Sequence, residues 1–301
     1  MFTDAKGIKR LKIGLHTHTT RSDGKKTPEE VAQLYAAAGY DAVALTDHWK
    51  YGEAQELCGL QILSGCEYNV GGADARDAVY HIVGVGMERD PGLTTALRDD
   101  PSMTSAEKAK TIIGAIRSVG GLAILAHPAW SLNTPAQCLA IGDFDATEIF
   151  NSVSEHGMSD RPYSGLIVDM LAGENGFCKP LLATDDAHYY AGDECRGMIM
   201  LEAEAAQTMG IVPAIRAGRF YATQGPEVHM ARREDGTVCL ACTPASKIVF
   251  FSNVVWVRNR VLRGENLTEA VYTPHAQDCF VRAEVTDAEG NCAWSNIIRL
   301  D

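Results

Sequence analysis

Six of the nine histidines lie in short motifs, with carboxylates beside them, at the ends of apolar runs. The motifs are His16-Thr17-His18, Asp47-His48, His81, His127-Pro128 and Asp186-Ala187-His188. A barrel or open sheet brings its strand ends together, so residues far apart in the sequence can face one small volume. Imidazole and carboxylate are ligands that zinc, manganese and iron accept. The pattern therefore predicts a multinuclear metal site at the strand ends of a sheet or barrel.

The first 225 residues alternate between strand-like and helix-like segments. Strands are expected at residues 11–15, 41–45, 61–64, 80–85, 122–125, 146–150 and 180–183, and helices at residues 27–39, 105–119, 163–172 and 212–217. Mostly apolar strands separated by helices indicate a parallel sheet that is covered on its outer face. Because each strand carries a polar residue at its C-terminal end, we expect a closed α/β barrel over residues 1–225.

The composition changes after Gly225-Pro226. Short β-type runs follow at residues 238–241, 247–252, 254–258 and 279–285, separated by turn signals such as Asp235-Gly236 and Glu289-Gly290. This spacing predicts a small all-β sandwich over residues 226–301, packed on the barrel without supplying metal ligands.

The formal net charge of −12 makes the surface repel nucleic-acid backbones and anionic membranes, so we expect neither as a partner. An anionic substrate would need local positive charge, which bound metal ions supply. Residues 1–11 lack the apolar core of a signal peptide, no run reaches membrane-spanning length, and the expected location is the cytoplasm. The nine cysteines are an odd number spread through apolar runs, so a disulfide framework is not expected.

The His-x-His and Asp-x-His pairs carry most of the argument for metal binding. In an extended chain the spacing i, i+2 places His16 and His18 on one face, and the same holds for Asp186 and His188. Asp23, in Ser-Asp-Gly, would by itself be interpreted as a turn carboxylate. Its nearness to the histidine pair makes it a candidate ligand instead.

Two further candidates end apolar runs. His48 is expected to be a ligand with Asp47 as the residue that orients it, although the reverse is also open. Glu67 ends a segment that resembles a buried strand, where a lone carboxylate is costly unless it is paired with a cation. A position between two metal ions would explain Glu67.

The remaining histidine candidates differ in strength. His81 lies inside a strand-like run and, taken alone, is more often a satisfied core residue than a ligand. His127 is followed by Pro128, which favours an extended backbone, as a strand-end ligand needs. Glu148 and Asn151 end another predicted strand and are candidates for orienting ligands or substrate.

These motifs, in this order, resemble the polymerase and histidinol phosphatase (PHP) family: His-x-His, Thr-Asp-His, Gly-x-Glu, a strand histidine, Ala-His-Pro and Asp-x-His. The Ser-Asp-Gly loop resembles that of its small-molecule phosphoesterases. The resemblance covers residues 11–188 and implies a distorted (β/α)7 barrel with two or three metal ions at the C-terminal strand ends. It also implies that the β tail occurs in only some members.

The resemblance assigns roles by position. The first metal would be held by His16, His18, Glu67 and Asp186, the second by Glu67, His81 and His127, and the third by Asp23, His48 and His188. The implied catalytic residues are Asp23, His48, Glu67 and His188. Arg21 and Arg196 are candidates for gripping phosphate oxygens, and solvated surface arginines are an equally good interpretation of both.

The implied function is a metal-dependent phosphoesterase. It would hydrolyse a phosphorylated small molecule of the nucleotide or sugar phosphate type, using two or three divalent ions (Zn, Mn or Fe) to activate water. One alternative is an interaction or regulatory module that retains metal for structure only. Another is an amidohydrolase-like hydrolase, which would usually place a ligating lysine in mid-chain, and no lysine ends a predicted strand between Gly65 and His127. Specificity is expected from loops at residues 69–77, 90–104 and 152–162.

Overall fold

The computed structural model of the protein describes residues 1–72, 74, 77–155 and 159–300, so the specificity loops expected at 69–77 and 152–162 lie partly outside the described residues. Its strands are β1 (Phe2–Thr3), β2 (Lys9–Gly14), β3 (Ala42–Ala44), β4 (Gln55–Leu57), β5 (Leu60–Leu63), β6 (Gly65–Val70), β7 (Tyr80–Val85), β8 (Leu122–Leu125), β9 (Ala146–Asn151), β10 (Leu181–Thr184), β11 (Met198–Glu202), β12 (Phe220–Thr223), β13 (Val228–Arg232), β14 (Val238–Phe251), β15 (Val261–Tyr272), β16 (Phe280–Thr286), β17 (Cys292–Trp294) and β18 (Ile298–Arg299). Its helices are α1 (Pro28–Ala37), α2 (Thr95–Asp99), α3 (Ser105–Ser118), α4 (Pro135–Ala140), the 3₁₀ turn η1 (Val153–Glu155), α5 (Gly165–Asn175), α6 (Ala203–Met209) and α7 (Ile211–Arg216).

The predicted helices begin where their capping residues lie. Thr27 caps α1 and forms a capping box with Glu30, and Pro28 occupies the first turn. Thr104 and Glu107 form the same box at the start of α3. The short helices α2, α4 and α6 were not predicted, because so few residues give little hydrophobic periodicity to detect. None of the helices described is both long and apolar enough to span a membrane.

The strands form two hydrogen-bonded sheets. The long sheet has the order β13-β14-β16-β17-β12-β11-β2-β3-β5-β4, and the second has the order β10-β9-β8-β7-β6. Parallel pairing is found for β2-β3-β5 and for β8-β9-β10. The expectation of an all-parallel sheet is wrong for β7, which is antiparallel to both β6 and β8. The connection from β6 to β7 is short and contains no helix among its described residues, and a parallel pair would need a long crossover.

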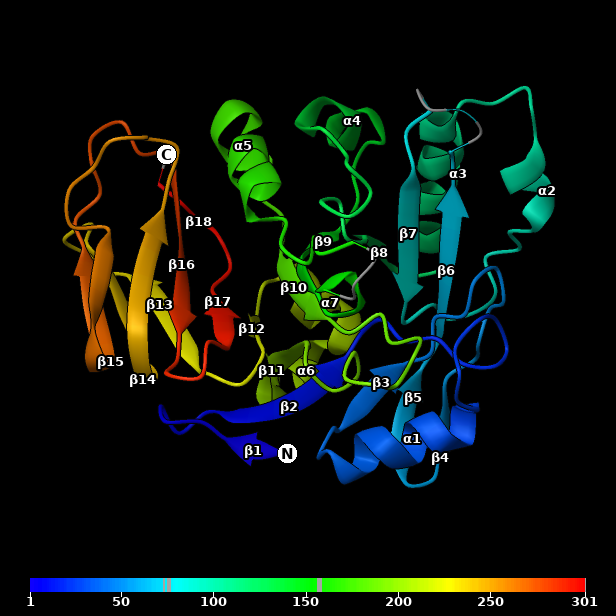
Figure 1. The fold of residues 1–301 in the computed structure, drawn as a ribbon, viewed down its shortest axis with the longest axis horizontal. Coiled ribbons are helices and arrows are strands. Elements are labelled where there is room, and N and C mark those ends of the chain that lie inside the picture. Colours follow the sequence, from blue (N-terminus) through cyan, green and yellow to red (C-terminus); the bar gives the residue numbers. More distant parts are fainter. Residues whose placement is uncertain (73, 75–76, 156–158, 301) are drawn as a thin grey trace.

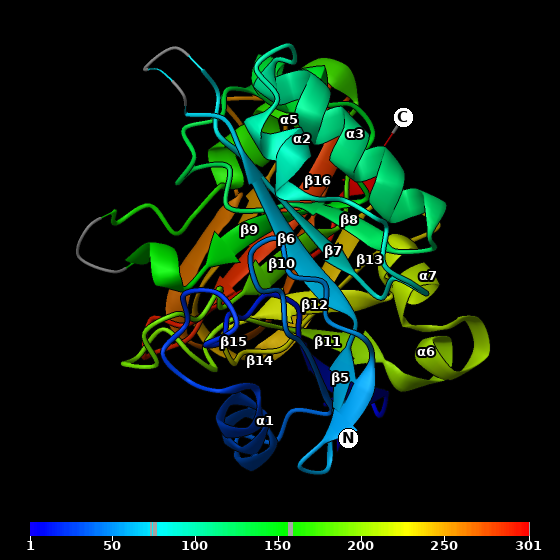
Figure 2. The same ribbon diagram turned by 90° about the vertical axis from the view of Figure 1, so that its right-hand side faces the viewer.

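The two sheets meet where the proposed ligands lie. Isolated bridges join Thr17 to Ala187 and His48 to Glu67. The space between the sheets is filled by apolar side chains from both, including Ile13, Val83 and Leu182. Figures 1 and 2 show β6–β10 with α3, α4 and α5 along one side and α1 at the far end of the molecule.

The C-terminal strands extend the long sheet. β17 pairs with β12, through Ala222 and Trp294, so β13–β18 are joined to the first region by main-chain hydrogen bonds (Figure 1). The sequence predicted a sandwich packed on the barrel, without this shared ladder. β14 is one strand of 14 residues where two runs were expected, and residues 254–258 do not form a strand.

The apolar contact between the two regions leads to a prediction for the shortened chain. The Trp294 indole stacks on Phe150 at 5.3 Å and is 2% exposed. A chain ending at Gly225 would expose this surface and the open edge of β12, so we expect it to be recovered mainly as aggregate. Soluble yield and thermal unfolding of the two lengths test this. A soluble, folded short chain that lost its metal would show instead that the tail supplies ligands.

Candidate metal centre

All nine predicted ligand side chains lie together. Most of them lie at or just beyond the C-terminal ends of strands, whereas His81 lies at the start of the antiparallel strand β7. They form three groups in which the candidate ligand atoms lie within 4.8 Å of one another: His16, His18, Glu67 and Asp186; Glu67, His81 and His127; and His18, Asp23, His48 and His188. The groups match the predicted sets, and His18 additionally joins the third. The strand ends bring these residues together because Asp186 N donates to His16 O at 2.9 Å and Glu67 N donates to Thr46 O at 3.0 Å.

The first group is the most tightly packed. The Nε2 atoms of His16 and His18 lie 3.2 and 2.9 Å from Glu67 Oε2, and both lie 3.1 Å from Asp186 Oδ1. Glu67 Oε2 and Asp186 Oδ1 are buried and have no hydrogen-bond partner among the described residues. Leaving a carboxylate oxygen buried without a donor is costly. Two imidazoles and two carboxylates whose free atoms converge in this way fit a divalent metal ion.

Glu67 lies between the first and second groups. Its Oε1 atom is 2.7 Å from His81 Nδ1 and 3.6 Å from His127 Nε2, whereas its Oε2 atom faces the first group. The two oxygens of one side chain therefore point to two different sets of ligands. This is the geometry expected of a carboxylate that bridges two ions.

The third group is more open. Asp23 Oδ1 lies 3.5 Å from His188 Nε2, and Asp23 Oδ2 lies 3.7 Å from His48 Nε2. The Asp23 side chain is 55% exposed. Burial would raise the pKa of Asp23, but the hydrogen bond and charge of His188 hold that pKa below its ordinary range. These ligands surround a position at the mouth of the site, closer to solvent than the first two groups.

The electrostatics of the first group show how strongly its charges depend on one another. Burial by itself would lower the pKa of His18, but Asp186 and Glu67 raise it to about 9. Burial would also lower the pKa of His16, but the same two carboxylates hold that pKa well above its ordinary value. In turn, burial would raise the pKa of Asp186, but the two histidines hold it far below the usual range. The carboxylates are anionic, and a divalent ion can replace the protons that compensate them.

Two residues behind the ligands orient them. Glu148 Oε1 lies 2.8 Å from His16 Nδ1, and its Oε2 accepts from the backbone N–H of His127 at 2.9 Å. Asn151 Nδ2 donates to Glu148 Oε2 at 2.8 Å and to Asp186 Oδ2 at 3.2 Å. With Nδ1 bound to Glu148, His16 presents Nε2 to the first group. The suggested orienting role of Glu148 and Asn151 agrees with these contacts.

Asp47 holds a loop and makes no hydrogen bond to the His48 ring among the described contacts. It accepts from the backbone N–H groups of Thr19 at 2.9 Å and Ser22 at 3.1 Å, and from both hydroxyls. The described contacts therefore give Asp47 a role other than the expected orientation of the His48 ring. Asp47 fixes the loop that leads from His18 toward Asp23.

Asp193 is a supporting residue that the sequence did not reveal. It is fully buried, and its carboxylate accepts from the backbone N–H groups of His188 at 2.7 Å and Tyr189 at 2.8 Å. Burial would raise the pKa of Asp193, but these backbone hydrogen bonds lower it. In the sequence Asp193 follows Ala-Gly and is indistinguishable from an ordinary turn residue.

Two ligands have an unusual backbone conformation. The φ angle is +29° at His127 and +54° at Asp186, where a residue other than glycine pays a strain energy. Pro128 was expected to keep His127 extended, and the positive φ shows that this expectation is wrong. The hydrogen bonds from His127 N to Glu148 and from Asp186 N to His16 hold both residues in place.

The two arginines predicted to bind phosphate have other partners. Arg21 Nη2 donates to Tyr51 O at 2.9 Å, and Arg196 Nη1 forms an ion pair with Glu155 at 2.5 Å. Neither lines the cavity at the metal centre. Their role in binding substrate stays a prediction, and it requires each side chain to leave its present partner.

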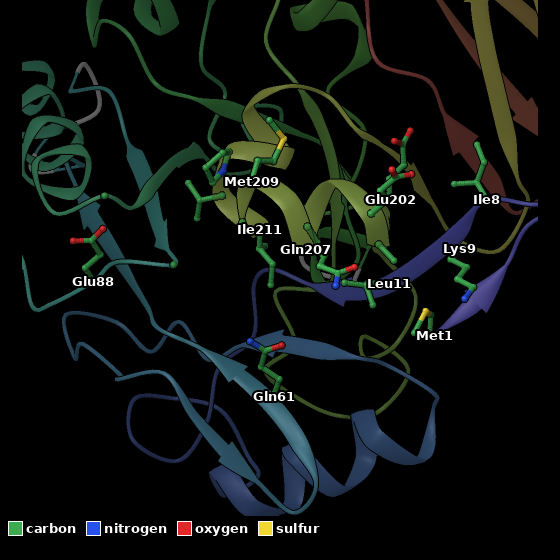
Figure 3. A pocket seen from close by; sticks show the side chains of 18 of the residues that line it. Met1, Ile8, Lys9, Leu11, Gln61, Glu88, Glu202, Gln207, Met209 and Ile211 are labelled. Carbon is green, nitrogen blue, oxygen red and sulfur yellow. The ribbon is translucent and has the colours of Figure 1, made fainter.

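The ligands open into a cavity of about 630 Å³, within the usual range for small-molecule sites. It is lined by Asp23, His48, Glu67, His81, His127, Trp130, Val153, Ser154, Ser159, Asp186, His188 and Tyr189. A larger hollow of about 1290 Å³ contains none of the nine ligands (Figure 3). It lies at the opposite end of the strands, beside Lys9 of β2 and Met209 of α6.

Comparison with known proteins agrees with this arrangement. A 3′,5′-nucleoside bisphosphate phosphatase from Chromobacterium violaceum is 38% identical over 93 residues, which is 29% of this chain and 32% of that protein. The chain thus matches about a third of the length of this relative. A two-domain protein from Bacteroides vulgatus that contains a predicted PHP-like metal-dependent phosphoesterase has the same overall fold, with a TM-score of 0.52 at 16% identity over 99% of this chain and 98% of that one. The PHP domain model matches residues 14–190, more than half of the sequence and every predicted ligand, so the chain belongs to the PHP domain family.

Proposed function

We propose that this protein is a metal-dependent phosphoesterase that acts on phosphorylated small molecules of the nucleotide or sugar phosphate type. The observation that carries the proposal is the sharing of Glu67 between two ligand groups that open into one cavity. A purely structural metal site is usually closed by protein ligands, whereas this one faces a space that a small molecule can fill. The relative from C. violaceum, a phosphatase of nucleoside bisphosphates, supports this reaction class.

The proposal includes a domain assignment. We infer that the two sheets and their shared core form the distorted barrel within residues 1–225, and that residues 226–301 form a second, all-β domain. The bridges at Thr17 and Glu67 support this, because they join the sheets at two separate edges.

The ligand sets assign positions to two or three divalent ions. The first ion would be held by His16, His18, Glu67 and Asp186, the second by Glu67, His81 and His127, and the third by Asp23, His48 and His188. Zinc, manganese or iron suits these donors, and such ions bound here would activate water and neutralise the phosphoryl oxygens.

The chain's own residues position these components and move protons. Glu148 fixes the His16 ring and the His127 backbone, and so sets the directions of the ligands. Asp23 and His188 lie at the exposed side of the site, where the leaving oxygen would depart toward solvent. With two ions bound and the third position empty, we assign to His188 the transfer of a proton from its Nε2 atom to that oxygen, and to Asp23 the orientation of the His188 ring. His48 and Glu67 complete the proposed catalytic set.

Metal removal is the direct test of the proposal. Protein purified without chelator is expected to contain two or three equivalents of transition metal by elemental analysis. Dialysis against a chelator should abolish hydrolysis of an aryl phosphate and lower the melting temperature, since the buried carboxylates lose their counter-ion. Adding back manganese, zinc or iron in turn should restore both. Less than one equivalent, with no gain in activity on adding any of them, would contradict the proposal.

A further inference from the structure

Two exposed aromatic side chains stand in the wall of the metal-centre cavity. Trp130 is 39% exposed and Tyr189 is 49% exposed, and both line the cavity. The centroid of the Trp130 ring lies 4.9 Å from that of His127, beside the second ligand group. The Tyr189 ring lies 6.3 Å from His188, beside the third group. Large rings left partly open to water at a binding site are typical surfaces for stacking against a flat ligand.

The described residues of the cavity wall carry no lysine or arginine. Asp23, Glu67 and Asp186 make the wall acidic, and its histidines belong to the proposed ligand groups, so positive charge for a phosphate would come from metal ions bound there. Arg196, the arginine that reaches toward this region through Ser152, is paired with Glu155. One phosphate can therefore be neutralised at the metal centre, whereas a second phosphate elsewhere in the cavity would find no cation among these residues.

Neutral polar groups complete the wall. Ser154 and Ser159 line the cavity, and the Ser159 hydroxyl has no hydrogen-bond partner among the described residues. Such a hydroxyl carries no charge, and it can both donate to and accept from a sugar hydroxyl group. The cavity volume of about 630 Å³ leaves room for more than the phosphate and a sugar.

From these features we propose that the substrate carries a single phosphate and a flat aromatic ring, as a nucleoside monophosphate does, and that Trp130 and Tyr189 determine this specificity. The inference rests on the proposed phosphoesterase function. It differs from the activity of the C. violaceum relative, whose substrate carries two phosphates.

The first test compares four substrates on the manganese-loaded full chain: a nucleoside 5′-monophosphate, the corresponding 3′,5′-bisphosphate, phenyl phosphate and ribose 5-phosphate. We expect kcat/KM for the monophosphate to exceed that for ribose 5-phosphate by about tenfold or more, the scale of stacking on one aromatic ring. The kcat/KM for the bisphosphate should be lower than that for the monophosphate. Phenyl phosphate shows which ring the site recognises. A kcat/KM equal to that of the nucleotide means that any aryl group is sufficient, and a lower kcat/KM means that the enzyme recognises the nucleoside.

Variants of the wall test the residues named. Trp130→Ala is expected to lower the ratio of the nucleotide to the ribose 5-phosphate kcat/KM by about tenfold, mainly through KM, and Trp130→Phe should restore most of it. Trp256→Ala is the matched control, because Trp256 is 89% exposed and does not line this cavity. Metal content measured on each variant shows whether the substitution has disturbed the neighbouring metal ligand His127.

The outcomes separate the two proposals. Equal kcat/KM for ribose 5-phosphate and the nucleotide, or a ratio unchanged in Trp130→Ala, would overturn the aromatic subsite and leave the phosphoesterase function standing. A higher kcat/KM for the bisphosphate would overturn the proposal that the substrate carries a single phosphate. It would favour Arg196 as the residue that binds the second phosphate. Hydrolysis of none of the four phosphates would overturn both the inference and the proposed function.

Discussion

Replacing Glu67 with glutamine is expected to lower kcat for phosphate hydrolysis on the order of a thousandfold or more, which corresponds to several kcal/mol of lost metal assistance. Glu67 is 1% exposed, and its two oxygens face two different ligand groups. Glutamine keeps the volume but replaces one oxygen by an NH₂ group that cannot bind a cation. The variant should therefore lose one or both of the first two ions while its core stays packed.

The measurement is kcat on an aryl phosphate, with metal content and circular dichroism recorded on the same sample. His127→Ala should behave in the same way, because it removes a ligand of the second group. Glu53→Gln is the matched control, since Glu53 is exposed and belongs to none of the three groups. Full activity in Glu67→Gln, with the circular dichroism unchanged, would mean that the metal centre is not the catalyst.

Most ligand positions could be predicted from the sequence because they end or follow an apolar run, whereas His81 lies inside one and Asp23 was indicated by the nearby His-x-His pair. His16 and Asp186 each lie two residues beyond the end of a strand, β2 and β10, and the bridge between Thr17 and Ala187 places them side by side. Strand-end residues need only the correct fold to converge, so their order along the chain was sufficient. The same holds for the capped helices α1 and α3, whose start signals are local.

The supporting contacts could not be predicted in this way. Asp193 and Asp47 bind backbone N–H groups of loops, and a loop conformation leaves little trace in one sequence. The direction of β7 was also missed, since an apolar run looks the same in a parallel and an antiparallel strand. The pairing of β17 with β12 depends on contacts between residues 222 and 294, which hydrophobic periodicity does not report.

The second large effect is expected at the contact between the two regions. Arg282 is fully buried, and its Nε and Nη2 atoms donate to the two oxygens of Asp169 in α5 at 2.6 and 2.8 Å. Its Nη1 atom lies 2.5 Å from Glu284, and the guanidinium lies 4.2 Å from the centre of the Phe251 ring. β16 is thereby tied to α5 through a charge that has no access to water.

We expect Arg282→Met to lower the free energy of unfolding by about 3–5 kcal/mol, because Asp169 would keep its charge without a partner. Burial already raises the pKa of Glu284 to about 8, so Glu284 would be left as a buried acid that has lost its hydrogen-bond donor. Urea unfolding followed by circular dichroism measures this. Arg98→Met is the matched control: Arg98 pairs with Asp99 at 2.8 Å, but its side chain is 42% exposed, so the transition should stay where it is.

A double variant separates charge from packing. In Asp169→Leu combined with Arg282→Met, the uncompensated Asp169 carboxylate is gone and apolar volume replaces the ion pair, so much of the lost stability should return. If the double variant were instead as unstable as the sum of the two single ones, the contribution of Arg282 would come from its packing on Phe251. The Arg282 Nη2 atom also donates to the Tyr163 hydroxyl at 3.1 Å. Tyr163 follows closely in the chain after Ser154 and Ser159, which line the cavity. Arg282→Met should therefore also raise KM for the phosphate substrate.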